Sequence, residues 1–468
     1  MSHQSASYRL SRRRFLGTLA GSAAAAILAA CGSGGSPTAT AKPSGGTGAT
    51  GATGAPAATA ASSSGKKVEL TFWKHNHNPA DDFTKVLIDE YQKQNPNVTI
   101  KLEIIPNDTI FTKIATAFAG GQAPDMFDLN DTTIPTYTSK GVVAPLDPST
   151  FGFASQADLE KAYVPNSLTP FKGPDGKIYG MPFEYNSWVM TINEKMFSDA
   201  GLDPAKDYPK TWAEVGTTGA KLVKMTNGRF DRQGFGWNLL TSGWTMLQYP
   251  PIVYQLGGSV LSDDDKGKQC VLNNAEGVEA LQKMQDIYYK YKAGAPGVNV
   301  STAQDPMADF TQEKVAMWIL GPWATPTFKG TPVENNYRIV PLPQASDGKR
   351  KVVSLSSWAW MVNGKSPNTA EAWKFVNYAQ QQGARWLTTS GYALPRLGWT
   401  DSPEAKAFKG LDVFIDQMQY ARPRLLNPNA SEINDVVHKA VQQALLNNTS
   451  AKQVLDAAAT DINKITSK

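Results

Sequence analysis

Residues 71–79, TFWKHNHNP, gather side chains that could do chemistry. They include two of the chain's four histidines, His75 and His77, whose His-x-His spacing could supply two metal ligands, with Asp81 or Asp131 as a third. No further residue stands at metal-ligand spacing, so we expect no metal site. Two interpretations remain open: these histidines and the interleaved asparagines contact a polar ligand, or they only cap a helix and a loop.

The elements around this stretch decide where its side chains lie. Residues 68–73 indicate a strand, Asn78-Pro79 a helix start, and the alternating residues 98–104 a second strand. A helix over 110–118 and a strand over 125–129 follow, and this order predicts a parallel, doubly wound sheet. Ligands of such sheets bind beyond the carboxyl ends of the strands. The ligand contacts predicted at this edge are Trp73, His75, Asn76, His77, Asn130 and Asp131.

The rest of the chain carries a second series of elements. About 400 residues follow position 65, which is enough for two packed lobes. The predicted segments are a strand over 188–192, a helix opened by the capping box of Thr211 and Glu214, a strand-like run over 233–240, a helix around 278–291, a strand over 315–320, two strands over 337–342 and 352–362 joined across a turn near Asp347-Gly348, and a helix from Ser366-Pro367.

The first residues are expected to be a targeting segment. Arg12, Arg13 and Arg14 form a twin-arginine pattern, and the apolar run over 19–30 is too short for a membrane span. The sequence LAAC that ends at Cys31 resembles a bacterial lipobox, in which the cysteine carries lipid and becomes the mature N-terminus. We therefore predict a signal peptide over 1–30, and a lipidated Cys31 with a flexible Gly, Ala, Ser, Thr and Pro tether over 31–65.

Charge and cysteine content exclude several classes of protein. The formal net charge is +5, and removing the four arginines of residues 1–30, which contain no acid, leaves +1. We infer no nucleic-acid partner from so weak an excess. Only Cys270 remains beside Cys31, so an internal disulfide and a cysteine metal cluster are both excluded. We expect no cofactor.

A series of short segments resembles the extracellular solute-binding proteins of family 1, the sugar-binding lipoproteins of ABC importers, to which maltose-binding protein is distantly related. The ordered set, rather than any single piece, carries the resemblance, and it spans residues 95–396. The matching pieces are NPNVTIKLE, GGQAPDMFDLN, KGVVAPLD, YGMPFEYNS, INEKMFSDAGLD, PKTWAEV, EKVAMWILGPW, SPNTAEAWKFVNYA and GYALPR.

The resemblance implies an α/β, two-lobe periplasmic-binding-protein-like fold of type 2, with doubly wound sheets joined by a hinge that the chain crosses repeatedly. The crossings are expected near 182–188, 320–323 and 362–366. The predicted lobes are therefore 66–182 with 323–362, and 183–322 with 363–468. The partners implied are a sugar or oligosaccharide, the transmembrane subunits of an ABC permease and, through the lipid, the outer face of the cytoplasmic membrane. A monomer without enzymatic activity is expected.

Aromatic and polar residues near these crossings are the further ligand candidates. All 12 tryptophans follow residue 72, and a tryptophan can stack on a sugar ring while polar groups bond its hydroxyls. Trp323 matches the stacking tryptophan of the family's Gly-Pro-Trp motif and ranks first. Trp212, Trp318 and Trp373 are assigned to packing. The remaining candidates are Glu184, Tyr185, Asn186, Trp237, Trp358, Tyr392 and Arg396.

Each of these candidates has a structural alternative. Trp237, Trp244 and Trp358 could each belong to the core rather than stack on a ligand. Glu184 could form a hinge salt bridge and Arg396 a surface ion pair. Maltose-binding protein, the distant relative, has charged groups at the end of the first strand, whereas residues 75–78 here are HNHN, so maltose is not assumed as the ligand.

Two alternatives to sugar uptake stay open. The same fold could bind glycerol phosphate, a polyamine or another small polar solute. A cell-surface polysaccharide-cleaving enzyme would need two carboxylates across a cleft, for which Asp131 and Glu184 are available.

Overall fold

A computed structural model describes residues 66–107, 109–296 and 306–467. The predicted signal peptide, Cys31 and the predicted tether lie outside the described residues. In the part of the chain that the structure describes, no helix is both long and apolar enough to cross a bilayer.

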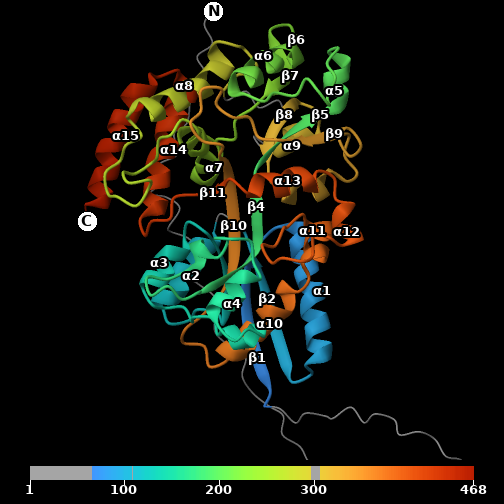
Figure 1. Ribbon diagram of the computed structural model, residues 1–468, viewed down its shortest axis with the longest axis vertical. Coiled ribbons are helices and arrows are strands. Elements are labelled where there is room, and N and C mark those ends of the chain that lie inside the picture. Colours follow the sequence, from blue (N-terminus) through green and yellow to red (C-terminus); the bar gives the residue numbers. More distant parts are fainter. Residues whose placement is uncertain (1–65, 108, 297–305, 468) are drawn as a thin grey trace, which may run out of the picture. The chain divides into compact units, whose positions relative to one another are not determined.

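The sheet of the first lobe has the strand order β11-β10-β3-β1-β2, and β4 pairs with β10 as well (Figure 1). β1 (Val68–His75) lies parallel to β2 (Val98–Ile105) and to β3 (Met126–Asn130). Each of these strands was predicted, and β1 continues two residues further, to His75. The parallel arrangement is confirmed for these three strands, whose carboxyl ends share one edge.

Helices flank this first sheet. α1 begins at Asn78 with proline in its first turn, as predicted. Its buried residues, which include Phe83 and Leu87, recur at helical spacing and pack in the core of the first lobe. The helical segments of this lobe are α1 (Asn78–Gln94), α2 (Ile110–Ala119), α3 (Ile134–Ser139), η1 (Pro148–Phe151), α4 (Gln156–Lys161), η2 (Thr169–Phe171), α10 (Thr369–Gln380) and α11 (Gly383–Ser390).

Two long antiparallel strands connect the lobes. β4 (Gly180–Ser187) and β10 (Val353–Val362) pair along most of their length, with a register shift between Trp358 and Ala359 (Figure 1). One end of β10 pairs with β11 (Ala421–Pro423) and the other with β3. β4 ends at Ser187, where the chain leaves the first sheet within the segment predicted as a crossing, 182–188, and the chain returns along β10.

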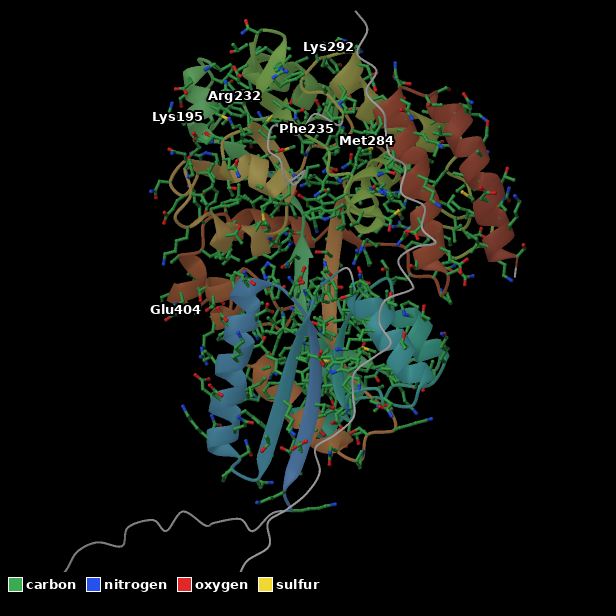
Figure 2. The ribbon with its side chains drawn as sticks, turned by 180° about the vertical axis from the view of Figure 1, so that it is seen from behind. Lys195, Arg232, Phe235, Met284, Lys292 and Glu404 are labelled. Atoms are coloured by element: carbon green, nitrogen blue, oxygen red, sulfur yellow. The ribbon has the colours of Figure 1, made fainter. Side chains whose placement is uncertain are left out.

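The second lobe has its own sheet, in the order β6-β7-β8-β5-β9. Phe235 and Met284, labelled in Figure 2, are fully buried in its core, whereas Lys195 and Glu404 are exposed. The capping box of Thr211 and Glu214 is present. The strands are β5 (Val189–Asn193), β6 (Lys224–Thr226), β7 (Arg229–Phe235), β8 (Val315–Leu320) and β9 (Tyr337–Val340).

The remaining helical segments are α5 (Glu194–Asp199), α6 (Trp212–Leu222), α7 (Ser242–Gln255), α8 (Ala275–Tyr289), α9 (Pro306–Thr311), η3 (Pro322–Phe328), α12 (Pro403–Lys406), α13 (Leu411–Met418), α14 (Ala430–Asn447) and α15 (Ala451–Thr466). The thiol of Cys270 is buried in the core of the second lobe.

The predicted division into lobes was wrong for two segments. β8 and β9 both pair with β5, on its opposite sides, so the chain stays in the second lobe after residue 320 and does not cross there. α10 packs in the core of the first lobe through Phe375 and Val376, so the segment after residue 362 belongs to that lobe.

Two local predictions were also wrong. β9 and β10 do not form a hairpin across Asp347-Gly348, because β9 pairs with β5 and β10 pairs with β4. The strand predicted over 233–240 is β7, which starts earlier and ends at Phe235. Apolar alternation alone indicated these strands, but it does not identify the partner strand.

Candidate functional site

Buried polar contacts hold the turn between β1 and α1 in place. Lys74 is fully buried, and its Nζ donates to Asp81 Oδ1 at 2.8 Å and to the His75 carbonyl at 2.9 Å. The other oxygen of Asp81 accepts from the backbone N–H of His77 at 2.9 Å. A buried ion pair with additional hydrogen bonds holds its surroundings in one geometry. The positions of both histidines therefore follow from Lys74 and Asp81.

His75 presents its ring as part of an aromatic surface. Its backbone N–H and its Nδ1 lie 3.0 and 2.7 Å from the two carboxylate oxygens of Asp128, at the buried centre of β3. A carboxylate only accepts, so Nδ1 carries the hydrogen. Burial lowers the pKa of His75, and Asp128 opposes this shift. The ring stacks on Trp358, with 3.8 Å between the centroids.

His77 stands at the N-cap of α1, yet its side chain does not cap the helix. Its ring stacks on Tyr392 at 5.1 Å and meets the edge of Trp323 at 5.9 Å, both measured between centroids. Burial, followed by the nearby charge of Lys74, lowers the pKa of His77 to about 3, so the imidazole is neutral at physiological pH. Its Nδ1 is buried and has no hydrogen-bond partner.

Trp323 joins this surface to the second lobe. It is the second residue of η3, which begins two residues after the end of β8, and it is half-buried. Its ring lies 5.8 Å from Trp244 and 6.1 Å from Trp188, and it packs against the core clusters of both lobes. We use "aromatic cluster" for His75, His77, Trp244, Trp323, Trp358 and Tyr392. Trp244, Trp323, Trp358 and His77 are only partly buried, so the cluster keeps exposed ring surface.

A buried polar cluster adjoins these rings. Asp131, one residue after β3, pairs with Arg424, one residue after β11, and both are at least nine-tenths buried. The Trp188 Nε1–H donates to Ser356 Oγ at 3.0 Å, and Ser356 donates to Glu184 Oε1 at 3.2 Å. Burial raises the pKa of Glu184 to about 8. Glu184 therefore carries its proton at neutral pH.

Several polar atoms of this cluster have unused hydrogen-bonding capacity. Asp131 Oδ2, Arg424 Nε, Asn186 Nδ2 and Ser357 Oγ are buried without a protein partner. Unsatisfied buried polar atoms are costly, and in native proteins they often mark a place where another molecule bonds. The polar cluster therefore offers a ligand two hydrogen-bond donors, one acceptor and one hydroxyl group that can donate or accept. These groups lie next to partly exposed aromatic rings.

The remaining predicted site residues lie elsewhere. Asn130 accepts from the Thr133 N–H and caps the turn into α3, and Asn76 Oδ1 accepts from the Asn107 N–H, so both serve loops as in the capping interpretation.

Trp237 is buried in the core of the second lobe, where its Nε1 donates to the Met284 carbonyl. Trp73 lies under the Lys113 ammonium, 4.3 Å from the ring centroid, beside α2.

Arg396 and Tyr185 complete the predicted set. Arg396 lies beside the buried Tyr163 rather than in a surface ion pair, and its guanidinium opposes the upward shift that burial imposes on the pKa of that phenol. Tyr185 is buried on β4, and burial raises the pKa of its phenol to about 12.

Sequence reasoning missed Arg424, Ser356 and Trp188, and it left Trp244 open between ligand stacking and core packing. Ser356 and Ser357 directly precede Trp358, so a polar pair beside a candidate aromatic residue was the available signal. Arg424 had none, because it reaches Asp131 only through the parallel pairing of β11 with β10.

The described ranges contain no group of three or more histidine, cysteine, aspartate or glutamate side chains that could hold a metal ion. In His75 the nitrogen nearest a carboxylate is the hydrogen donor, which leaves it unavailable as a ligand.

Comparison with known proteins identifies the family. Residues 75–386, about two thirds of the chain, match the sequence profile of the bacterial extracellular solute-binding proteins. The chain belongs to this family. The predicted resemblance is thus confirmed, and the family consists of binding proteins rather than enzymes.

Two relatives of this chain are themselves named as binding proteins. The chain is 25% identical over 431 residues to the arabinooligosaccharide-binding protein of Bacillus subtilis (strain 168), covering 86% of this chain and 94% of that one. The chain is also 24% identical over 418 residues to a protein of Brucella abortus (strain 2308) described as a binding protein, and the match covers 87% of this chain and 95% of that one.

Solved structures confirm the predicted fold class. The solute-binding protein of Thermotoga lettingae with bound α-D-tagatose matches with a TM-score of 0.74 at 24% identity, covering 85% of this chain and 99% of that one. The maltose-bound MalE3 of Thermotoga maritima matches with a TM-score of 0.73 at 21% identity, covering 85% and 100%. The solute-binding protein therefore has the two-lobe, type 2 fold.

Proposed function

We propose that this solute-binding protein captures a neutral sugar or oligosaccharide between its lobes and delivers it to an ABC permease. The observation that carries the proposal is the aromatic cluster, whose partly exposed rings adjoin buried polar atoms without partners. Aromatic rings stack on the apolar face of a sugar, and bidentate polar groups bond its hydroxyls. Relatives whose names state a sugar ligand give independent support.

The charges around the cluster favour a neutral ligand over the glycerol phosphate and polyamine alternatives. Arg424 is paired with Asp131, and Lys74 is paired with Asp81, so neither cation is left over for a phosphate. Burial keeps the proton on Glu184 at neutral pH, so it offers no free carboxylate to a polyamine. A sugar needs donors and acceptors but no net charge.

Delivery to a permease requires a closed form that differs from the empty one. A ligand shifts the population toward the closed form only through contacts that it makes there and not in the open form. Asp131 follows β3 of the first lobe, whereas Arg424 precedes Leu425, which packs in the core of the second lobe, so a ligand held by both would favour closure. Membrane attachment through a lipidated Cys31, and export by a twin-arginine signal, are part of the same proposal and rest on the sequence alone.

The test is calorimetric titration with a panel of mono- and oligosaccharides, followed by Trp323→Ala with the best ligand. Loss of one stacking ring costs about 1 to 3 kcal/mol, so affinity should fall roughly tenfold to a hundredfold. Trp73→Ala is the matched control, because Trp73 is also partly buried but lies against Lys113. Equal losses in both variants, or none in Trp323→Ala, would contradict the proposed site.

Membrane attachment has a separate test. Mass spectrometry of the membrane fraction is expected to find a diacylglyceryl-modified Cys31 at the mature N-terminus. A mature protein that begins elsewhere would contradict this part of the proposal.

A polysaccharide-cleaving enzyme is the second candidate function. Burial raises the pKa of Asp131 and the Arg424 guanidinium opposes this shift, while Glu184 carries its proton. Glycosidases use a pair of carboxyl groups, one ionised and one protonated. Incubation with oligosaccharides and analysis of the products discriminates between the two candidates. We expect stoichiometric binding without turnover, because both carboxyl groups are almost fully shielded.

A further inference from the structure

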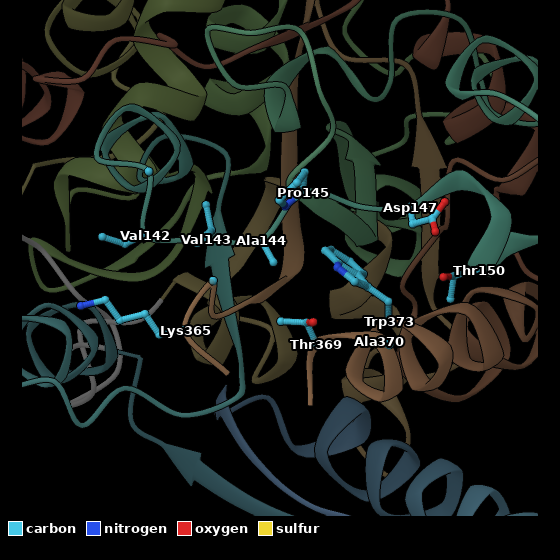
Figure 3. A pocket seen from close by; sticks show the side chains of 12 residues that line it. Val142, Val143, Ala144, Pro145, Asp147, Thr150, Lys365, Thr369, Ala370 and Trp373 are labelled. Atoms are coloured by element: carbon cyan, nitrogen blue, oxygen red, sulfur yellow. The ribbon is translucent and has the colours of Figure 1, made fainter. Parts of the chain in front are cut away.

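A cavity lies in the first lobe, away from the aromatic cluster. Its volume is about 520 Å³, and it is bounded by the segments 141–150 and 364–373 (Figure 3). The lining residue Gly364 lies two residues after Val362, which pairs with Met126 at the start of β3, whereas Trp358 pairs with Asn130 at its end. Four strand residues separate these ends by about 13 Å. The cavity is therefore distinct from the proposed sugar site.

The cavity has well-ordered walls. The Ala144 N–H donates to the Val362 carbonyl at 2.8 Å, and the Gly364 N–H donates to the Val142 carbonyl at 2.9 Å. These bonds hold the apolar wall of Val142 to Pro145 against the segment that leads into α10. Asn368 extends the connection to β1, because its Nδ2 donates to the Glu69 carbonyl at 3.1 Å. The start of β1 thus lies beside this cavity.

One side of the cavity attracts negative charge. Thr369 and Ala370, the first residues of the twelve-residue helix α10, line it, and the N-cap residue Asn368 places no side chain over the first N–H groups. Free N–H groups and the helix dipole make such an end a site for phosphate and similar anions. Lys365 also lines the cavity, is exposed and forms no ion pair with any residue that the structure describes.

A buried donor points independently to a ligand. The Trp373 side chain lines the cavity and is 2% exposed, and its Nε1–H has no acceptor. Its indole lies among the lining side chains in Figure 3. Side chains on a helix lean toward its N-terminus, so Trp373 leans back over the turn that begins at Thr369. An acceptor bound at the N-terminal end of that turn would lie close both to its N–H groups and to the indole.

Two acidic residues limit what the ligand can be. Asp147 lines the opposite side, where its Oδ1 accepts from the Ser149 N–H at 2.9 Å. Glu371, in the first turn of α10, is turned to the Tyr91 hydroxyl and to Lys374. A ligand that is anionic throughout would meet Asp147, whereas one with hydroxyl groups at its far end could donate to that carboxylate.

We propose that this cavity binds a phosphate ester of a small polyol. The phosphoryl group lies at the start of α10, between Lys365 and Thr369, and accepts from the Trp373 indole. The carbon chain contacts the apolar wall, and its hydroxyl groups face Asp147. A volume of this size accommodates more than an inorganic ion. Such an ester occurs free and as the headgroup of an anionic lipid.

The experiment uses the full chain and two probes, glycerol 3-phosphate in solution and vesicles of phosphatidylglycerol. We expect saturable binding of at least one probe, weakened about five- to tenfold by Lys365→Ala and by Trp373→Phe. Binding of the soluble probe alone identifies a free ester, and vesicle binding alone identifies a lipid headgroup. Glycerol alone and phosphatidylcholine vesicles are the negative probes.

Two results would overturn the proposal: no binding of either probe, or binding that Lys365→Ala leaves unchanged. Lys365 is exposed, so this variant is expected to fold even if Trp373→Phe does not. Trp323→Ala is the matched control, since it alters the sugar site and should leave binding of both probes intact. A protein that binds the phosphate ester but no sugar would contradict the proposed function and leave this inference standing.

Discussion

Replacing Glu184 with glutamine should stabilise the protein at neutral pH. Burial is the main cause that raises the pKa of Glu184 from its usual 4.5 to about 8. Between these values the unfolded chain releases the proton while the folded chain retains it. A carboxyl group with a raised pKa thus contributes its full stability below pH 4.5 and loses it progressively as the pH rises toward 8.

The size of the effect follows from the shift. Each pH unit above the unfolded pKa costs about 1.36 kcal/mol, so the penalty approaches about 3 kcal/mol at pH 7. Glutamine resembles the protonated carboxyl group and can still accept from Ser356. We expect Glu184→Gln to raise the free energy of unfolding by up to this amount at pH 7 and to have almost no effect at pH 4.5.

Urea unfolding of both proteins between pH 4.5 and 8 measures the difference. Glu404→Gln is the control, because Glu404 is exposed and its replacement should give a difference that is small at every pH. If the Glu184→Gln difference is also flat across this range, Glu184 is ionised in the folded protein. The assignment of Glu184 as a neutral member of the polar cluster would then be wrong.

Three further predictions concern the same region. Arg424→Met should cost about 3 to 5 kcal/mol of stability in urea unfolding, because it leaves Asp131 buried and unpaired. Adding Asp131→Asn should recover most of this loss, and a double variant as unstable as the single one would contradict the prediction. Trp237→Ala should cost about 3 to 5 kcal/mol in the same assay and leave sugar affinity unchanged in calorimetry, unlike Trp323→Ala. The pKa of His77 is about 3 in the folded protein and 6.5 in the unfolded chain, so only the unfolded chain gains the proton as the pH falls below 6.5. The wild-type protein should therefore lose about 2 kcal/mol of stability between pH 7.5 and 5 through this residue, and His77→Gln should remove that loss. Urea midpoints at the two pH values measure it, and an exposed His77 would give no such difference.

Sequence reasoning worked where the chain determines structure locally. The strand–helix–strand order put His75, His77 and Asp131 at one edge, because the carboxyl ends of parallel strands share an edge whatever else packs there. Pro79 and the capping box of Thr211 also marked helix starts correctly, since each acts through its own neighbours.

Sequence reasoning failed where a partner distant in the chain decides the outcome. β9 looked like one arm of a hairpin, but β5 is its neighbour, and this single pairing moves residues 323–352 into the other lobe. Trp237 and Trp323 are the same residue type near similar strand ends, yet one is core and the other joins two lobes. Arg424 became visible only through its contact with Asp131.

The burial of Cys270 makes the protein a convenient starting point for an optical sensor. Burial raises the pKa of this thiol to about 11, and only the thiolate reacts with alkylating dyes. A form of the protein that begins after Cys31 would therefore be almost unreactive to a maleimide at neutral pH. A cysteine introduced at the exposed Asn76, beside the aromatic cluster, would be labelled alone, and its fluorophore would report the arrival of solute at the neighbouring rings.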